Sequence, residues 1–218
     1  MTMHYSLIKS KPTDPKEIEL YNQIYEFWKS QWSDVLGDKF CGDDFFRQEY
    51  ISVITDDEKI AAIHLYTNFN SAFESNQDHS YFKDYPKDFF NKMRELNYLK
   101  YTTCESLTVH PDFRKTNLSR VLFQISFSLA PYFHSDALIG PTIIKNGASK
   151  TGQEAGAQVA FSQINYKGYE CDILYYPKTC ILIKQDQIVN HMVERLWKNR
   201  SDYTGLTLDI DAKEKLVA

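Results

Sequence analysis

One continuous segment, residues 101–133, constrains the fold more than any other part of the sequence. It begins with the run "YTTCESLTV", continues through the basic loop "HPDFRKTNLSR" and ends with the apolar run "VLFQISFSLAPYF". The first run is rich in β-branched and aromatic residues, which favour a strand. The last run is apolar on most sides, as in a buried helix, and Asn117 stands where it can cap that helix. This order of strand, loop and helix predicts an α/β fold in which helices cover a sheet.

The rest of the chain predicts further strands and helices around this segment. Apolar patterns of period two indicate strands, and patterns of period 3.6 indicate helices. We expect strands at 4–10, in a hairpin over 48–69, at 137–144, and in a second hairpin made of 169–176 and 179–185. We expect helices from the "TDP" at 13–15 to Gly37, at 85–99, at 149–164 and at 187–200, with a loop at 70–84. Hairpins give antiparallel pairs and helical crossovers give parallel ones, so the sheet should be mixed. No linker or internal repeat stands out, which predicts a single domain over residues 1–218.

Composition narrows the classes of function. The chain has 218 residues, a net charge of −4, and no segment in which Lys and Arg gather, so general nucleic-acid binding is not expected. No run approaches the roughly 20 apolar residues of a membrane span. The N-terminus lacks the apolar core of a signal peptide, so we expect a cytoplasmic protein. The four cysteines form no Cys-x-x-Cys pair, so no metal site is expected.

The loop after the central strand resembles the signature of the GNAT superfamily of acyl-CoA N-acyltransferases. That signature is a strand ending in Val-x-Pro, an aromatic residue, and Arg/Gln-x-x-Gly-x-Gly/Ala opening a helix. Asn117 and Ser119 stand where the family has its two glycines. Six positions keep the register without gaps: Val109, Pro111, Phe113, Arg114, Leu118 and Leu122.

The resemblance implies a fold and a co-substrate. The fold is an α/β (α+β) domain with a mixed, mostly antiparallel sheet, helices on both sides and splayed middle strands. It covers about residues 4–185 and leaves the helix at 187–200 as an addition. The co-substrate is acetyl-CoA or another acyl-CoA, whose pyrophosphate binds the loop backbone and the positive end of the following helix. Asn tolerates the left-handed conformation that glycine usually supplies. By this resemblance, the cofactor-binding residues are Leu107, Thr108, Val109, Arg114, Lys115, Thr116, Asn117, Leu118, Ser119 and Arg120.

Two residues are candidates for the catalytic groups. Many family members carry a carboxylate at the position of Thr103, and period-two alternation places Glu105 on the same face of the strand. Glu105 is therefore a candidate general base, or else a carboxylate that pairs with a basic residue. The family usually has a Tyr that protonates the leaving thiolate. That Tyr would fall at Ile164, where it is missing, and Tyr166 is the candidate substitute.

Three functions remain open at this stage. The first is an enzyme that transfers an acyl group, most simply acetyl, from acyl-CoA to a small-molecule or peptide amine. The second keeps the fold but takes a long-chain donor or an acyl carrier protein, as N-acyl amino acid and acyl-homoserine-lactone synthases do. The third is a non-catalytic protein that binds a ligand or partner. The apolar stripe of the helix at 187–200 fits either the core or a second subunit, so a homodimer also remains open.

Overall fold

The computed structural model describes residues 2–57, 59–177 and 186–206 of the chain. Their strands are β1 (Met3–Lys9), β2 (Tyr50–Asp56), β3 (Lys59–Asn70), β4 (Lys100–Val109), β5 (Ala137–Ile143), β6 (Gln158–Tyr166), β7 (Tyr169–Pro177) and β8 (Ser201–Tyr203). Their α-helices are α1 (Pro15–Leu36), α2 (Asp43–Phe46), α3 (Glu74–Gln77), α4 (Phe89–Glu95), α5 (Leu118–Tyr132), α6 (Ala148–Glu154) and α7 (Gln187–Lys198). Short 3₁₀ turns are η1 (Gly37–Lys39), η2 (Ser80–Phe82) and η3 (Pro111–Phe113).

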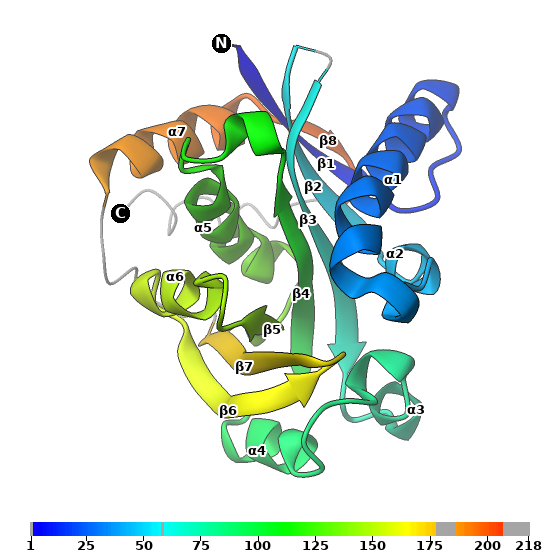
Figure 1. The fold of residues 1–218 in the computed structure, drawn as a ribbon, viewed down its shortest axis with the longest axis vertical. Coiled ribbons are helices and arrows are strands. Elements are labelled where there is room, and N and C mark those ends of the chain that lie inside the picture. The colour runs from blue at the N-terminus through cyan, green and yellow to red at the C-terminus, as the bar shows by residue number, and fades with distance from the viewer. Residues whose placement is uncertain (1, 58, 178–185, 207–218) are drawn as a thin grey trace. The chain divides into compact units, whose positions relative to one another are not determined.

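The described strands form one sheet in the order β6-β7-β5-β4-β3-β2-β1-β8 (Figure 1). β1 with β2, β2 with β3, β5 with β7, and β6 with β7 are antiparallel, whereas β4 with β5 and β1 with β8 are parallel. The parallel register of β4 with β5 covers Tyr101–Thr103 and Ala137–Ile139, although both strands continue beyond it. The mixed, mostly antiparallel sheet flanked by helices is therefore confirmed.

The described residues fall into two compact units, each made of segments that are separate in the sequence. The first unit lies within Met1–Thr67, Glu105–Ile125 and Gln185–Gly205, and the second within Asn68–Cys104, Ser126–Lys184 and Leu206–Ala218. β4 contributes to both, with Lys100–Cys104 in the second unit and Glu105–Val109 in the first. The single domain expected over residues 1–218 stays a prediction.

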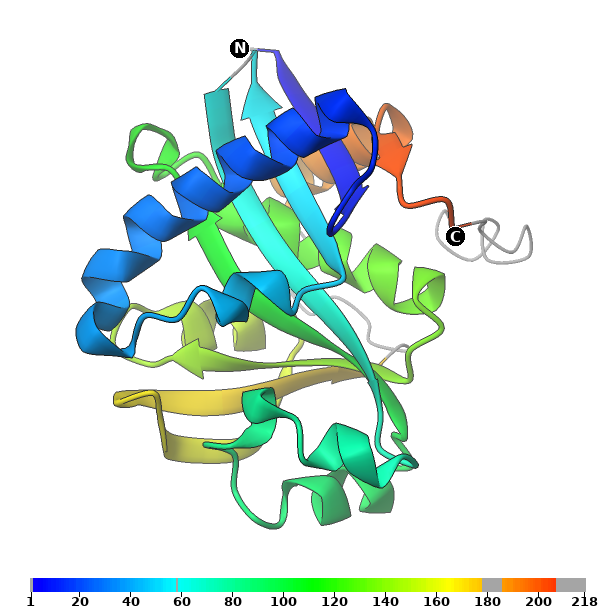
Figure 2. The same ribbon diagram turned by 90° about the vertical axis from the view of Figure 1, so that its right-hand side faces the viewer.

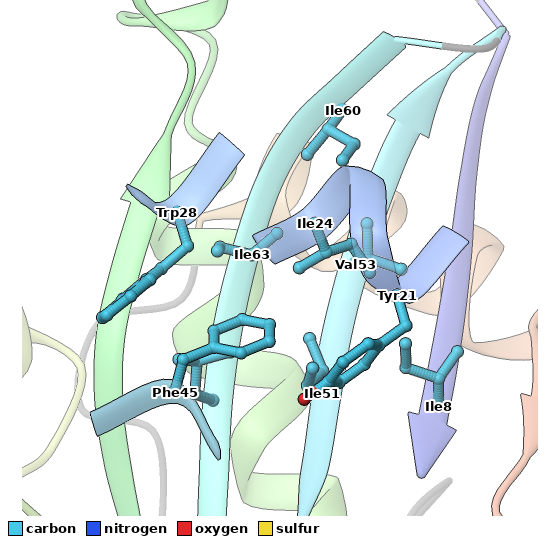
Figure 3. Close-up of a cluster of buried hydrophobic side chains, with 10 residues drawn as sticks. Ile8, Tyr21, Ile24, Trp28, Phe45, Ile51, Val53, Ile60 and Ile63 are labelled. Atoms are coloured by element: carbon cyan, nitrogen blue, oxygen red, sulfur yellow. The ribbon is translucent and has the colours of Figure 1, made fainter. Parts of the chain in front are cut away.

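In the first unit, α1 crosses one face of β1, β2 and β3 (Figure 2). Asp14 starts the helix because its carboxylate accepts the N–H groups of Lys16 and Glu17, and Pro15 follows at the first turn. Gly37, with φ of +52°, ends the helix as expected. The face that α1 presents to the sheet is apolar, and α2 adds one aromatic ring (Figure 3). The buried cluster contains Ile8, Tyr21, Ile24, Trp28, Phe45, Ile51, Val53, Ile60, Ile63 and Leu65.

The opposite face of the same strands packs on α5 and α7. His64 follows Ile63 in β3 and therefore points to the other face, where its ring meets the edge of Phe123 from α5. Burial lowers the pKa of His64 from 6.5 to about 3, so the ring is neutral, as a core histidine should be. Tyr5 of β1 stacks on Trp197 of α7. The three strands are thus covered on both faces.

The second unit has an aromatic core. Tyr101 of β4 and Phe89 of α4 are fully buried within it, and Tyr85 donates a 2.7 Å hydrogen bond to the Tyr81 hydroxyl. Most of the ring pairs meet edge to face, the arrangement that the ring quadrupole favours. The buried members are Phe69, Tyr81, Phe82, Tyr85, Phe89, Met93, Tyr101, Ile139, Ile173 and Tyr175.

The sequence-based predictions fail most clearly after residue 154. The helix expected at 149–164 ends at Glu154, because Gly156 with φ of +105° cannot continue it, and 158–166 forms β6 instead. The last described hairpin is therefore β6–β7 around Lys167 and Gly168, which both have positive φ as a type I′ turn requires. The strand expected at 179–185 lies outside the described residues.

Three smaller differences complete this comparison. Residues 70–84 were expected to be a loop but contain α3 and η2, and the helix expected at 85–99 is shortened to Phe89–Glu95. The short strand β8, which follows α7 and pairs with Ser6–Ile8 of β1, was missed. None of the described helices is long and apolar enough to cross a membrane.

Candidate active site

The loop between β4 and α5 adopts two left-handed conformations without a glycine. Lys115 has φ of +72° and Asn117 has φ of +63°. Asn is one of the few residues that tolerate this region, whereas Lys is not, so the surrounding structure must hold Lys115 there. The loop backbone thus has left-handed conformations that usually require glycine, although its residues are larger.

Buried apolar residues hold this loop at both ends. Phe113 and Leu118 are 7% and 1% exposed, so the segment between them is short and fixed at each side. The N–H of Thr116 donates to the Phe113 carbonyl at 3.3 Å, and the carbonyl of Asn117 accepts the N–H of Val121 at 3.0 Å, which opens α5. The first N–H groups of a helix have no partner within it, and they lie at its positive end. The start of α5 is therefore suited to an anion.

The charged residues of the loop fall into two groups. Arg114 and Lys115 are exposed. Arg120, by contrast, lies 3.6 Å from the carboxylate of Asp186, which caps α7. Asp112 pairs with Lys59, which lowers the pKa of the Asp112 carboxyl. Arg114 and Lys115 are consequently the best placed of the predicted basic residues to meet a phosphate.

Just before the loop, β4 departs from regular strand geometry at Ser106. Its φ of +52° is left-handed, which interrupts the pleat of the strand, and we call this feature the Ser106 kink. The Thr108 hydroxyl donates to the Ser106 carbonyl at 2.7 Å and accepts the indole N–H of Trp32 at 2.8 Å. The N–H of His110 donates to Ala61 in β3 at 2.9 Å and anchors the end of the strand.

Glu105 forms a buried ion pair beside the kink. The Arg47 guanidinium bonds to the carboxylates of both Glu105 and Asp44, and the three side chains are between 9% and 11% exposed. Gln48 donates a 3.1 Å hydrogen bond to Glu105, and its own amide oxygen accepts from Thr67. Glu105 thus pairs with a basic residue, and its role as general base stays a prediction. Two carboxylates around one guanidinium leave a net negative charge there.

Tyr166 lies in the second unit, at the end of β6. Its ring meets the edges of the Tyr81 and Tyr85 rings, with centroids 6.4 and 5.7 Å away. Lys167, the first residue of the turn, holds its ammonium group 5.7 Å from the Tyr166 ring centroid. Glu105 belongs to the first unit, so the two predicted catalytic residues belong to different units.

The sequence analysis missed Trp32, Arg47 and Gln48. Trp32 is partly buried against the apolar cluster under α1, and its indole N–H also bonds to Thr108 of β4. Arg47 and Gln48 follow the four-residue helix α2, which is too short to show a period. The acidic and basic residues three apart in "DDFFRQ" were the available signal, because Asp44 and Arg47 then share a helical face.

Comparisons with solved structures agree on one fold. A mosquito arylalkylamine N-acetyltransferase-like 5b is 14% identical, with a TM-score of 0.59 over 81% of this chain and 100% of that chain. The AHL synthase LasI is 12% identical, with a TM-score of 0.55 over 85% and 99%. FeeM, an N-acyl amino acid synthase from uncultured soil microbes, is 12% identical, with a TM-score of 0.53 over 82% and 92%. No family model and no curated protein matches the sequence.

These similarities define the class of fold. At such low identities they show the fold alone, and that fold is the GNAT acyltransferase fold, as the loop motif predicted. By their names, the neighbours include N-acetyltransferases, an N-acyl amino acid synthase and an AHL synthase. Within the described residues, no group of three or more His, Cys, Asp and Glu side chains is arranged to hold a metal.

Proposed function

We propose that this protein is an N-acyltransferase, which moves an acyl group, most simply acetyl, from a CoA thioester to an amine. The observation that carries the proposal is the loop at 114–120. Lys115 and Asn117 give it the left-handed turns of a phosphate-binding loop, and it opens directly onto the N-terminus of α5. The pyrophosphate would bind the first N–H groups of α5, with Arg114 and Lys115 adding charge.

The Ser106 kink supplies the second part of the proposed site. In a trans peptide the carbonyl and the next N–H point in opposite directions, so the Leu107 N–H points away from the Thr108 hydroxyl that binds the Ser106 carbonyl. The backbone of Leu107–Val109 would pair with the pantetheine arm. The Leu107 N–H would donate to the thioester oxygen, which becomes negative as the amine attacks.

The proposed chemistry needs two proton transfers. The neutral amine attacks the thioester carbon, and the thiolate of CoA leaves when the tetrahedral intermediate collapses. Glu105, which forms an ion pair with Arg47, would take the proton of the amine directly or through water. Tyr166 is the proposed donor to the thiolate on the strength of the family resemblance. Tyr166→Phe keeps the ring contacts with Tyr81 and Tyr85, so a loss of turnover in this variant would reflect the hydroxyl alone.

A second candidate donor is a long acyl chain or an acyl carrier protein. Asn117 and Ser119 place side chains where the family has glycines, which hinders the close approach of a free pyrophosphate. A carrier protein offers a single phosphate on its pantetheine and an acidic surface for the exposed Arg114 and Lys115. LasI and FeeM, two of the structural neighbours, are by their names an AHL synthase and an N-acyl amino acid synthase.

Calorimetry with acetyl-CoA, a long-chain acyl-CoA and an acylated carrier protein tests these alternatives. Tight binding of acetyl-CoA supports the first, and a preference for the long chain or the carrier supports the second. Binding of none of the three contradicts both and leaves a non-catalytic protein. Arg114→Ala should weaken donor binding about tenfold, because one charge-assisted phosphate contact is lost. Lys16→Ala removes an exposed charge from the first turn of α1 and should leave the affinity unchanged.

A further inference from the structure

The left-handed conformation of Ser106 needs an external cause. Ser is not among the residues that enter this region readily, and a strand offers no local compensation for it. Such a conformation persists only where surrounding contacts determine it. Two hydrogen bonds form a chain that reaches this point, from Trp32 to Thr108 and from Thr108 to the Ser106 carbonyl.

This chain has a fixed direction. The indole N–H of Trp32 can only donate, so the Thr108 hydroxyl must accept from it and use its own hydrogen for the Ser106 carbonyl. A hydroxyl that accepts a hydrogen bond is polarised and donates more strongly. Thr108 is 9% exposed, so water has little access to replace either bond. The plane of the Ser106–Leu107 peptide is therefore set from α1.

Resting on the proposed function, we infer that Trp32 is a positioning residue for acyl transfer. Through the Thr108 hydroxyl it fixes the Ser106–Leu107 peptide, and so it aims the Leu107 N–H at the oxygen of the donor thioester. Trp32 touches no reacting atom itself. Trp32 thus has a functional role, whereas the rest of the apolar stripe of α1 packs on the sheet.

Steady-state kinetics of three variants test this role. The assay uses acetyl-CoA and the amine that the wild-type protein acetylates fastest in a panel of arylalkylamines, polyamines and amino acids. Trp32→Phe and Thr108→Val should lower kcat about tenfold to a hundredfold, since they misplace one oxyanion donor, while KM for acetyl-CoA changes less than about threefold. Thr108→Ser retains the hydroxyl and should rescue the turnover that Thr108→Val loses.

A measurement without any ligand separates this inference from the proposed function. The ¹³C resonance of the Ser106 carbonyl reports the hydrogen bond that it accepts. It should move in the same direction in Trp32→Phe and Thr108→Val, and stay in place in Thr108→Ser. Trp28→Phe is the matched control, because Trp28 lies one turn earlier on α1 and its buried indole N–H has no hydrogen-bond partner among the residues that the structure describes. That variant should lose stability without moving the Ser106 resonance.

The outcomes are distinct. An active wild type whose kcat and Ser106 resonance are unchanged in Trp32→Phe overturns the inference and leaves the proposed function intact. A wild type that transfers no acyl group from any donor contradicts the proposed function and the catalytic part of the inference together. The positioning role is supported if Trp32→Phe and Thr108→Val shift the Ser106 resonance and lower kcat, while Thr108→Ser shows neither effect.

Discussion

The two halves of β4 have similar residues but different structures. Lys100–Thr103 form a regular strand that is buried after its first residue and pairs in register with β5. Glu105–Val109, just as rich in β-branched and apolar residues, are mostly half-exposed and interrupted by the Ser106 kink. Packing explains the first half, because Tyr101 lies in an aromatic core. The second half depends on hydrogen bonds from side chains that are distant in the sequence, from Trp32 and Arg47.

This difference separates a part of the strand that stabilises the fold from the part that the proposed function uses for binding. A regular ladder satisfies its backbone groups internally and leaves little for a ligand. In the irregular half, Ser106 has a left-handed backbone and its carbonyl accepts a hydrogen bond from the Thr108 side chain. Variants in the two halves should therefore fail in different ways.

The largest effect is expected in the regular half. Tyr101→Ala removes a fully buried ring and should lower the free energy of unfolding by about 4 kcal/mol, as for other large-to-alanine changes in a core. Val109→Ala, at a half-exposed position of the same strand, should cost about 1 kcal/mol. Urea unfolding measures both. Equal losses at the two positions would contradict the contrast between the halves.

Next in size is the ion pair beside the kink. Arg47→Met leaves the carboxylates of Glu105 and Asp44 nearly buried without their cation and should cost about 3 kcal/mol. Adding Glu105→Gln to this variant removes the charge of one of the two carboxylates and should restore part of the loss. A double-mutant cycle by urea unfolding gives the coupling energy, and a value near zero would show that the pair contributes nothing.

His64 tests the regular core of the first unit through its pH dependence. Its pKa of about 3 lies below the unfolded value of 6.5, so between these values the unfolded chain binds the extra proton. The stabilising contribution of neutral His64 is fully present above pH 6.5. The free energy of unfolding then falls by up to about 1.4 kcal/mol per pH unit as pH drops toward 3. His64→Asn should flatten this acid limb in thermal melts at graded pH. An unchanged slope would assign the acid sensitivity to other groups.

The smallest effect is expected in the loop. Asn117→Gly keeps the left-handed conformation without strain, so the free energy of unfolding should change by less than about 1 kcal/mol. Asn117→Val places a β-branched residue at positive φ and should cost about 1–2 kcal/mol. Thermal denaturation compares the two. A Val variant as stable as the Gly variant would show that the loop does not hold this conformation.

The sequence predicted the fold where local patterns and packing agree. The cap at Asp14, the glycine at the end of α1 and the hairpin of β2 and β3 all have short-range signals. β6 was missed because the bulges near Phe161 break its alternation. Gly152 and Gly156 indicated a weakened helix rather than the start of a strand. The loop motif indicated the candidate site, but Trp32 and Arg47 reach β4 through contacts at sequence separations of 76 and 58 residues. Such contacts leave no periodic trace.

The non-glycine residues of the loop also affect the order of the unbound protein. Glycines leave the unfolded chain more conformations to lose, and replacing them where the native backbone accepts the new residue reduces that loss. Lys115, Asn117 and Ser119 therefore give a stiffer loop than glycines would, provided the folded state tolerates their conformations. Such a loop loses little conformational entropy when a donor binds to it. If the proposed function holds, the donor should bind this loop with a smaller entropic penalty than a flexible glycine loop would impose, although its phosphate approaches the backbone less closely.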